Sequence, residues 1–196
     1  MQIKSRPDTI AEFLRRLGHR VALIGRKPVD RAPKSTIIWP VEQDDVVDQV
    51  CYLGDLYHAV YCNLNPLADY MLKAVPEAGR SVNDAMIRAR TRVLIDIDGH
   101  DVPKAVARAQ KDSIKAEIGD PLIETDSGNG YGLIYTCDLP NDEQSKHRVQ
   151  VYLQRLKSRF PCVDTSVFGA GRLTRIIGTC NRSVIDRSRI STEILN

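Results

Sequence analysis

The feature that most constrains the fold is a short apolar run that ends in two aspartates, over residues 92–98. The apolar residues predict a strand, and Asp is disfavoured inside strands, so Asp96 and Asp98 need a reason to be there. Side chains two residues apart on a strand point the same way, with Cα atoms about 6.5 to 7 Å apart. Two carboxylates in this arrangement can converge on metal ions about 3.5 to 4 Å apart. The alternate apolar residues would then pack into the core on the opposite face.

Other interpretations of this run stay open. Asp98 and Gly99 could form an ordinary turn, and Asp96 could cap the segment that follows. A calcium-binding loop starting at Asp96 would need Gly at its sixth position and Glu at its twelfth, where Asp101 and Ala107 stand.

The order of predicted elements indicates an α+β fold. From about residue 90 the order is strand, helix, strand, helix, strand, which predicts a small sheet with helices on one face. The first 90 residues would form an appended N-terminal α/β lobe. Helices are expected at 8–17, 42–53, 82–90, 103–118 and 141–160, and strands at 57–62, 92–98, 131–136 and 173–177. Asn141 is the expected N-cap of the last helix.

Size and composition favour an ordinary cytoplasmic protein. The chain has 196 residues, of which 42% are hydrophobic and 27% charged. No stretch approaches the roughly 20 consecutive apolar residues of a membrane span, and the N-terminus lacks the apolar run of a secretory signal. The five cysteines form no C-x-x-C pair, so buried thiols are expected rather than a zinc site or disulfides.

Basic residues gather toward the end of the chain. The net charge is +3, but residues 145–196 contain ten Lys and Arg against three Asp and Glu. A basic surface beside an acidic centre suits a polyanionic partner, although a solvated basic face is at least as common. On the helix expected at 141–160, the residues proposed to contact DNA are Lys146, Arg148, Arg155 and Lys157.

Two further segments suit phosphate chemistry. Ser127, Asn129 and Gly130 lie in a glycine-rich stretch whose backbone could approach a nucleotide phosphate, although such a stretch is more often only a turn. Arg172 and Arg175 follow the lone acid Asp164, and arginine forks suit phosphate oxygens. On a straight strand these two arginines would face opposite sides, so only one would reach a nucleotide.

Together and in this order, these motifs resemble the primase-polymerase cores of phage and plasmid replication proteins, in the archaeo-eukaryotic primase superfamily. The resemblance covers roughly residues 57–196. The matching segments are 63–66, 93–98, 127–131, 138–142, 163–168 and 172–182.

The resemblance implies a role for each acid. Asp96 and Asp98 match the paired metal-binding acids of the family, and Asp164 matches its third acid, so the three would be catalytic ligands of Mg²⁺ or Mn²⁺. Arg172 and Arg175 lie where the family presents basic residues to the incoming triphosphate. One position departs from the pattern, because Gly132 stands where the family's second motif normally ends in a histidine that contacts the triphosphate.

The implied fold is an N-terminal lobe, residues 1–90, packed on a palm-like module of the RNA-recognition type, residues 91–196. The implied reaction is template-dependent nucleotidyl transfer on single-stranded DNA, using an NTP or dNTP. Similar proteins carry this core ahead of a helicase or helix-bundle domain, so residues 1–196 would be one catalytic domain of a longer replication protein. The alternative is a degenerate, non-catalytic module that binds single-stranded DNA, which Gly132 favours and the three acids oppose.

Overall fold

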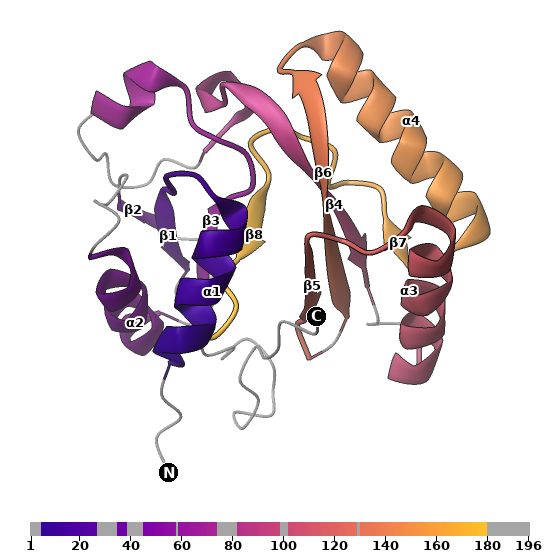
Figure 1. The fold of residues 1–196 in the computed structure, drawn as a ribbon, viewed down its shortest axis with the longest axis horizontal. Helices are drawn as coiled ribbons and strands as arrows, with labels where there is room; N and C mark the ends of the chain where they lie inside the picture. The colour runs from indigo at the N-terminus through magenta and orange to yellow at the C-terminus, as the bar shows by residue number, and fades with distance from the viewer. Residues whose placement is uncertain are drawn as a thin grey trace.

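The described residues form two four-stranded sheets, each flanked by helices (Figure 1). The computed structural model describes residues 5–26, 35–38, 45–57, 59–73, 82–98, 102–128 and 130–179. The elements in chain order are α1 (Pro7–Leu17), β1 (Leu23–Arg26), β2 (Ser35–Ile38), α2 (Val46–Leu56), β3 (Ala59–Asn63), η1 (Asp69–Lys73), η2 (Asp84–Met86), β4 (Ala89–Ile97), α3 (Lys104–Ile118), β5 (Ile123–Asp126), β6 (Tyr131–Pro140), α4 (Glu143–Arg159), β7 (Val163–Asp164) and β8 (Leu173–Arg175).

The first sheet has the strand order β2-β1-β3-β8, and all its pairings are antiparallel. Its last strand, β8, comes from the C-terminal part of the chain, so the first sheet is not built from the first 90 residues alone. The second sheet has the order β5-β6-β4-β7 and is also antiparallel throughout. In Figure 1, α1 and α2 flank the first sheet, and α3 and α4 cover the face of the second sheet that is turned away from it.

The two faces of β4 pack into different cores. Ile95 and Ile97 lie in a core with Leu133 of β6 and with the buried side of α4, including Leu153. Leu94, one residue along, lies in another core with α1 and α2. Because side chains alternate along a strand, Asp96 shares the face of Leu94 and points between the two sheets.

Most predicted elements are present, and the differences have local causes. The expected α+β fold is confirmed. The helix predicted at 82–90 is wrong, because only the short η2 forms there and β4 already begins at Ala89. The chain is instead extended from Ile87, which pairs with Leu67, and the N–H of Arg88 donates to the carbonyl of Pro66 at 2.9 Å. The side-chain oxygen of Asn65 then accepts the backbone N–H groups of Thr91 and Arg92 at 2.9 and 2.8 Å, at an irregularity in the β4 register.

The cap of α4 also differs from the prediction. Asp142, not Asn141, accepts the N–H of Ser145 at 2.7 Å. Asn141 instead donates to the carbonyls of Asp84 and Ile87. The four cysteines within the described ranges are free thiols.

No helix among the described residues is both long enough and apolar enough to cross a membrane.

Candidate active site

Asp96 and Asp164 stand directly opposite each other on neighbouring strands. They are register partners in the antiparallel pairing of β4 with β7. The Cβ atoms of such partners lie about 4.5 to 5.5 Å apart on one face of the sheet. The register continues from Asp96 to Gly132 of β6 and then to Thr125 of β5. These four register partners, Asp164, Asp96, Gly132 and Thr125, form the Asp96 row. The strand register therefore unites two acids that are far apart in the sequence.

Asp98 lies at the same end of the sheet, one residue beyond β4. Its backbone N–H donates to the carbonyl of Cys162 at 2.9 Å, which extends the contact between β4 and the segment that enters β7. The side chain of Asp98 is exposed. All three predicted acids are thus gathered around the β4–β7 edge.

The side chains of the opposed acids already have cationic or polar neighbours. The Asp164 carboxylate accepts the backbone N–H and the hydroxyl of Ser166, each at 2.8 Å. Asp96 is 38% exposed, and its Oδ2 lies 3.9 Å from Nη2 of Arg172. Since like charges directly opposite each other are destabilising, the guanidinium offsets part of the repulsion between Asp96 and Asp164.

Arg172 and Arg175 face opposite sides, as expected for residues three apart. Arg172 precedes β8 and reaches the Asp96 row. Arg175 donates to the hydroxyl of Tyr61 at 3.0 Å and lies 5.4 Å from the centre of its ring. Arg172 alone of this pair therefore belongs to the site around Asp96.

The donor chemistry of this site fits a divalent cation. Carboxylate oxygens are the ligands that suit Mg²⁺ and Mn²⁺, and a cation between Asp96 and Asp164 would relieve their repulsion. In the described part of the chain, no three His, Cys, Asp or Glu side chains are yet gathered closely enough to hold a metal ion. Two of the acids are instead occupied by Arg172 and Ser166, as described above.

Comparison with solved structures identifies the fold. The AEP domain of the cyanophage S-2L primase-polymerase superposes with a TM-score of 0.62 and 16% identity, over 98% of this chain and 89% of that one. The chain has the fold of a primase-polymerase catalytic domain. The catalytic domain of primase RepB′ in complex with initiator DNA matches with a TM-score of 0.57 and 16% identity, over 94% of this chain and 81% of that one. A second structure of RepB′ matches with a TM-score of 0.58 and 17% identity, over 90% of this chain and 51% of that one. The sequence matches no protein-family model and no curated protein, so the likeness lies in the structure.

Within this primase-polymerase fold, the predicted nucleotide loop is a closed hairpin turn between β5 and β6. Ser127 and Gly130 are joined by a backbone hydrogen bond of 3.0 Å, and the Ser127 hydroxyl accepts the N–H of Gly130 at 3.1 Å. The N–H of Gly128 donates to Asp126 at 2.7 Å, and Gly128 has a positive φ of 90°. These amides therefore donate within the loop rather than toward a cradled anion. Asn129 lies outside the described residues.

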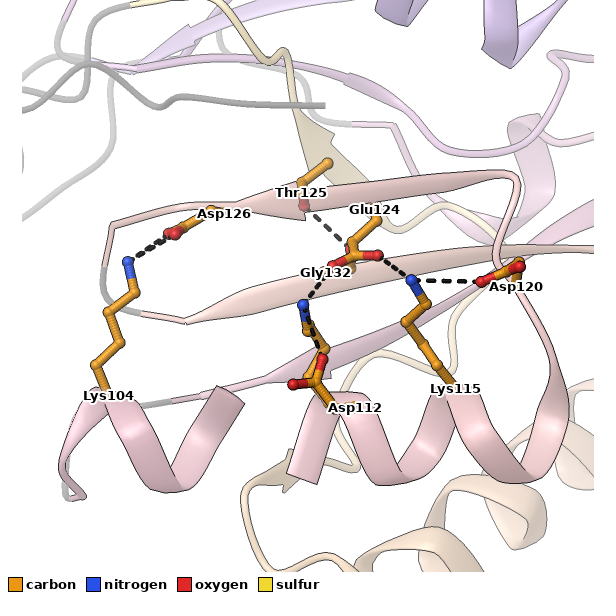
Figure 2. A network of polar contacts seen from close by, with 9 residues as sticks. Lys104, Asp112, Lys115, Asp120, Glu124, Thr125, Asp126 and Gly132 are labelled. Atoms are coloured by element: carbon orange, nitrogen blue, oxygen red, sulfur yellow. Dashed lines mark hydrogen bonds and ion pairs between the residues drawn. The ribbon is translucent and has the colours of Figure 1, made fainter. Parts of the chain in front are cut away.

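A network of lysines fastens α3 to β5 and to this loop (Figure 2). The Glu124 carboxylate, only 2% exposed, accepts from Lys111 at 2.5 Å and from Lys115 at 2.6 Å. Burial alone would raise the pKa of Glu124, but the two ammonium groups lower it below its ordinary value. Lys104, at the first turn of α3, contacts Asp126 at 2.6 Å. Since Asp126 also holds the Gly128 amide, α3 fixes the shape of the loop.

The basic helix α4 lies on the far side of the second sheet from Asp96. Its apolar side packs under Ile95 and Ile97, so its basic residues do not line the Asp96 row. Lys146 contacts Asp84 at 3.3 Å, and Lys157 donates to the carbonyl of Val163 at 3.1 Å. Of the four residues predicted to bind DNA, Arg148, Arg155 and Lys157 are exposed on α4, and Lys146 is half-buried.

Two buried asparagines of the matching segment 63–66 link the end of β3 to β4. Asn63 accepts the N–H of Ala22 at 2.6 Å and donates to the carbonyl of Asn65 at 2.6 Å. Asn65 holds β4, as described above, and donates to the carbonyl of Ala170 at 3.1 Å. The only sequence signal for this role was polarity at the end of an apolar strand.

Proposed function

We propose that the chain is the catalytic domain of a replication primase or primase-polymerase, which joins nucleotides on a single-stranded DNA template. The observation that carries the proposal is the register of Asp96 opposite Asp164, with the Arg172 guanidinium 3.9 Å from Asp96. The fold shared with primase catalytic domains supports it. Such a domain would belong to a longer replication protein and would act beside a helicase.

Asp96, Asp98 and Asp164 would hold Mg²⁺ or Mn²⁺ in this function. When bound, the ions would lower the pKa of the attacking hydroxyl and stabilise charge on the phosphoryl group. Asp96 and Asp164 would bring the ligand oxygens together from two strands of one sheet. Asp98, exposed at the end of β4, would complete the set from the solvent side.

Arg172 would bind the triphosphate of the incoming NTP or dNTP. Its planar fork suits phosphate oxygens. At 3.9 Å from Asp96 the guanidinium is beyond direct hydrogen-bond distance, so it can turn to a phosphate without breaking a short bond. Ser127, Asn129 and Gly130 stay proposed as backbone contacts to the nucleotide, and Arg175, held by Tyr61, as a more distant one.

The template would run along a basic surface that lies outside the Asp96 row. Arg148 and Arg155 are proposed to contact its phosphates, together with Lys146 and Lys157 at the ends of the same helix. Phosphate contacts carry no sequence information directly, so the domain would bind single strands with little sequence preference.

The test is nucleotide incorporation by the purified domain on single-stranded DNA with Mg²⁺ or Mn²⁺, with and without a primer. Asp96→Asn should reduce incorporation to less than about a tenth, because losing a catalytic metal ligand costs several kcal/mol. Binding of single-stranded DNA should be nearly unchanged. Asp138→Asn, an exposed carboxylate on β6, is the matched control and should keep full activity.

One observation favours the alternative, a non-catalytic module that binds single-stranded DNA. Gly132 presents no side chain beside Asp96, and Thr125 fills the space above it. A wild-type domain that binds DNA but incorporates no nucleotide with either metal ion would support this alternative and overturn the catalytic proposal.

A further inference from the structure

The turn that carries Arg172 into the site is clamped by a segment with no predicted role. Gly171 N–H donates to Oδ1 of Asp84 at 2.8 Å. A Cβ atom at Gly171 would lie 2.4 Å from the carbonyl carbon of Asn83 and 2.7 Å from its Cα, so the two backbones are in direct contact. Only glycine permits this approach, because the obstructing atoms are backbone and cannot rotate away.

Asp84 is itself held from two other elements. Its Oδ2 lies 3.3 Å from the ammonium group of Lys146 on α4, and its backbone carbonyl accepts Asn141 Nδ2 at 2.6 Å. Partial burial would raise the pKa of Asp84, but the Gly171 N–H and Lys146 lower it below its ordinary value. The carboxylate is therefore charged at neutral pH and bridges the second sheet's helix to the turn before β8.

Other contacts hold the chain on both sides of Gly171. Asn65 Nδ2 donates to the Ala170 carbonyl at 3.1 Å, and Arg90 Nη1 donates to the Phe168 carbonyl at 2.7 Å. The N–H of Arg172 donates to the carbonyl of Gly169 at 3.2 Å within the turn, and the Arg172 carbonyl accepts Leu64 N–H at 3.0 Å from the first sheet. The bond from Gly171 N–H to Asp84 is therefore the contact that holds the residue next to Arg172.

We propose that Asp84 is a positioning residue, which holds the Gly171–Arg172 turn so that the Arg172 guanidinium faces Asp96. Lys146 supports this role through its contact with the Asp84 carboxylate, and the contacts of Asp84 with Gly171 and Lys146 are together called the latch. The inference rests on the proposed function, since it concerns the residue proposed to bind the triphosphate. It also gives Lys146, proposed above to contact the template, a second role through its contact with Asp84.

The experiment compares Asp84→Ala, Asp84→Asn and Arg172→Ala, singly and as the double variant Asp84→Ala/Arg172→Ala. Asp84→Ala should raise the nucleotide KM about tenfold, the loss expected when one charge-assisted hydrogen bond is removed. The kcat should change less, and DNA affinity should stay the same. Asp84→Asn keeps an acceptor for Gly171 and should retain most of the wild-type KM. Asp138→Ala is the control for loss of an aspartate elsewhere in the second sheet.

The double variant distinguishes positioning from general damage to the fold. If Asp84 acts through Arg172, adding Asp84→Ala to Arg172→Ala should leave the KM unchanged. Independent, multiplicative effects of the two substitutions would overturn the proposal while leaving the proposed function intact. A wild type that neither incorporates nor binds nucleotide would instead defeat the proposed function.

A second measurement does not depend on activity. Amide hydrogen exchange should become at least tenfold faster over residues 169–173 in Asp84→Ala, and should change little in Asp84→Asn. Unchanged protection in Asp84→Ala would show that the turn does not need Asp84, and would refute the latch even if the enzyme were inactive.

Discussion

Replacing Gly132 by alanine probes the space beside Asp96. A Cβ atom at position 132 would lie 2.6 Å from Thr125 Oγ1 and 3.4 Å from Leu94 Cδ1. The first distance forces Thr125 to rotate and to give up its 3.2 Å hydrogen bond to the Gly132 carbonyl. Such overpacking costs about 1 to 3 kcal/mol. Gly132 is not among the described glycines with positive φ, so alanine also restricts the unfolded chain and regains about 0.4 to 1 kcal/mol.

The net expectation is a loss of about 1 to 2 kcal/mol in the free energy of unfolding. Whether Gly132→Ala destabilises or stabilises depends on the clash with Thr125. In a Thr125→Ala background the obstructing atom is gone, so Gly132→Ala should stabilise by about 0.4 to 1 kcal/mol. Thr125→Val keeps a branched side chain in the same place and should preserve the clash. The assay is urea unfolding, with the change read from the midpoint at constant m-value. Equal effects of Gly132→Ala in all three backgrounds would refute the packing argument.

The same pair of residues governs whether a histidine can be placed beside the acids. An imidazole that donates to a phosphate oxygen contributes about 1.5 to 3 kcal/mol, or roughly 10- to 150-fold in nucleotide affinity. Gly132→His alone should gain less than this, because Thr125 blocks its Cβ atom. Gly132→His with Thr125→Ala should lower the nucleotide KM and leave DNA affinity unchanged. A double variant that is well folded and active but has no lower KM would show that the phosphates lie out of reach of position 132.

Two further predictions concern stability and DNA binding. Glu124→Gln should destabilise the domain by about 3 kcal/mol, because it leaves a buried ammonium group with a poorer partner. The pKa of Glu124 is lowered from its ordinary 4.5, so the contribution of its carboxylate to the free energy of unfolding is present above that pH and is lost as the pH falls. Glu124→Gln should therefore weaken the loss of urea-unfolding stability at acid pH. An unchanged loss of stability at acid pH would contradict the reasoning. Arg148→Gln with Arg155→Gln should reduce the salt dependence of single-stranded DNA binding by about 0.7 in log–log slope per lost phosphate contact; an unchanged slope would place the template elsewhere.

The long, strongly patterned elements could be predicted from the sequence. The apolar spacing that ends at Gly18 gives α1, and Gly18 has the left-handed conformation expected of a C-cap residue. Strand β4 is predicted from its apolar run, and the long helices α3 and α4 lie within the predicted ranges 103–118 and 141–160. In each case the local pattern and the tertiary packing favour the same structure.

The short strands β1, β2, β5 and β7 could not be predicted, because their stability comes from partners rather than from their own residues. The strand expected at 173–177 is confirmed as β8, although it has only three residues. Strand β7 has only two residues and exists through pairing with β4, far away in the sequence. The register that sets Asp96 opposite Asp164 is for the same reason invisible in the sequence. The sequence did identify Asp96, Asp98, Asp164 and Arg172 as candidates for one site.

The site draws its negative and positive charges from different sheets. Asp96 and Asp164 belong to the second sheet, whereas Arg172 is tied to the first through the N–H of Leu64. A change in the separation of the two sheets would therefore alter the distance between the Arg172 guanidinium and the Asp96 carboxylate, even if the pairing of strands within each sheet stayed the same. The buried asparagines of the 63–66 segment and the contact of Asp84 with Gly171 bridge the two sheets at this level. Thr125 of β5 occupies the space beside Gly132. The position of the Arg172 guanidinium relative to Asp96 therefore depends on how rigidly these contacts hold the first sheet against the second.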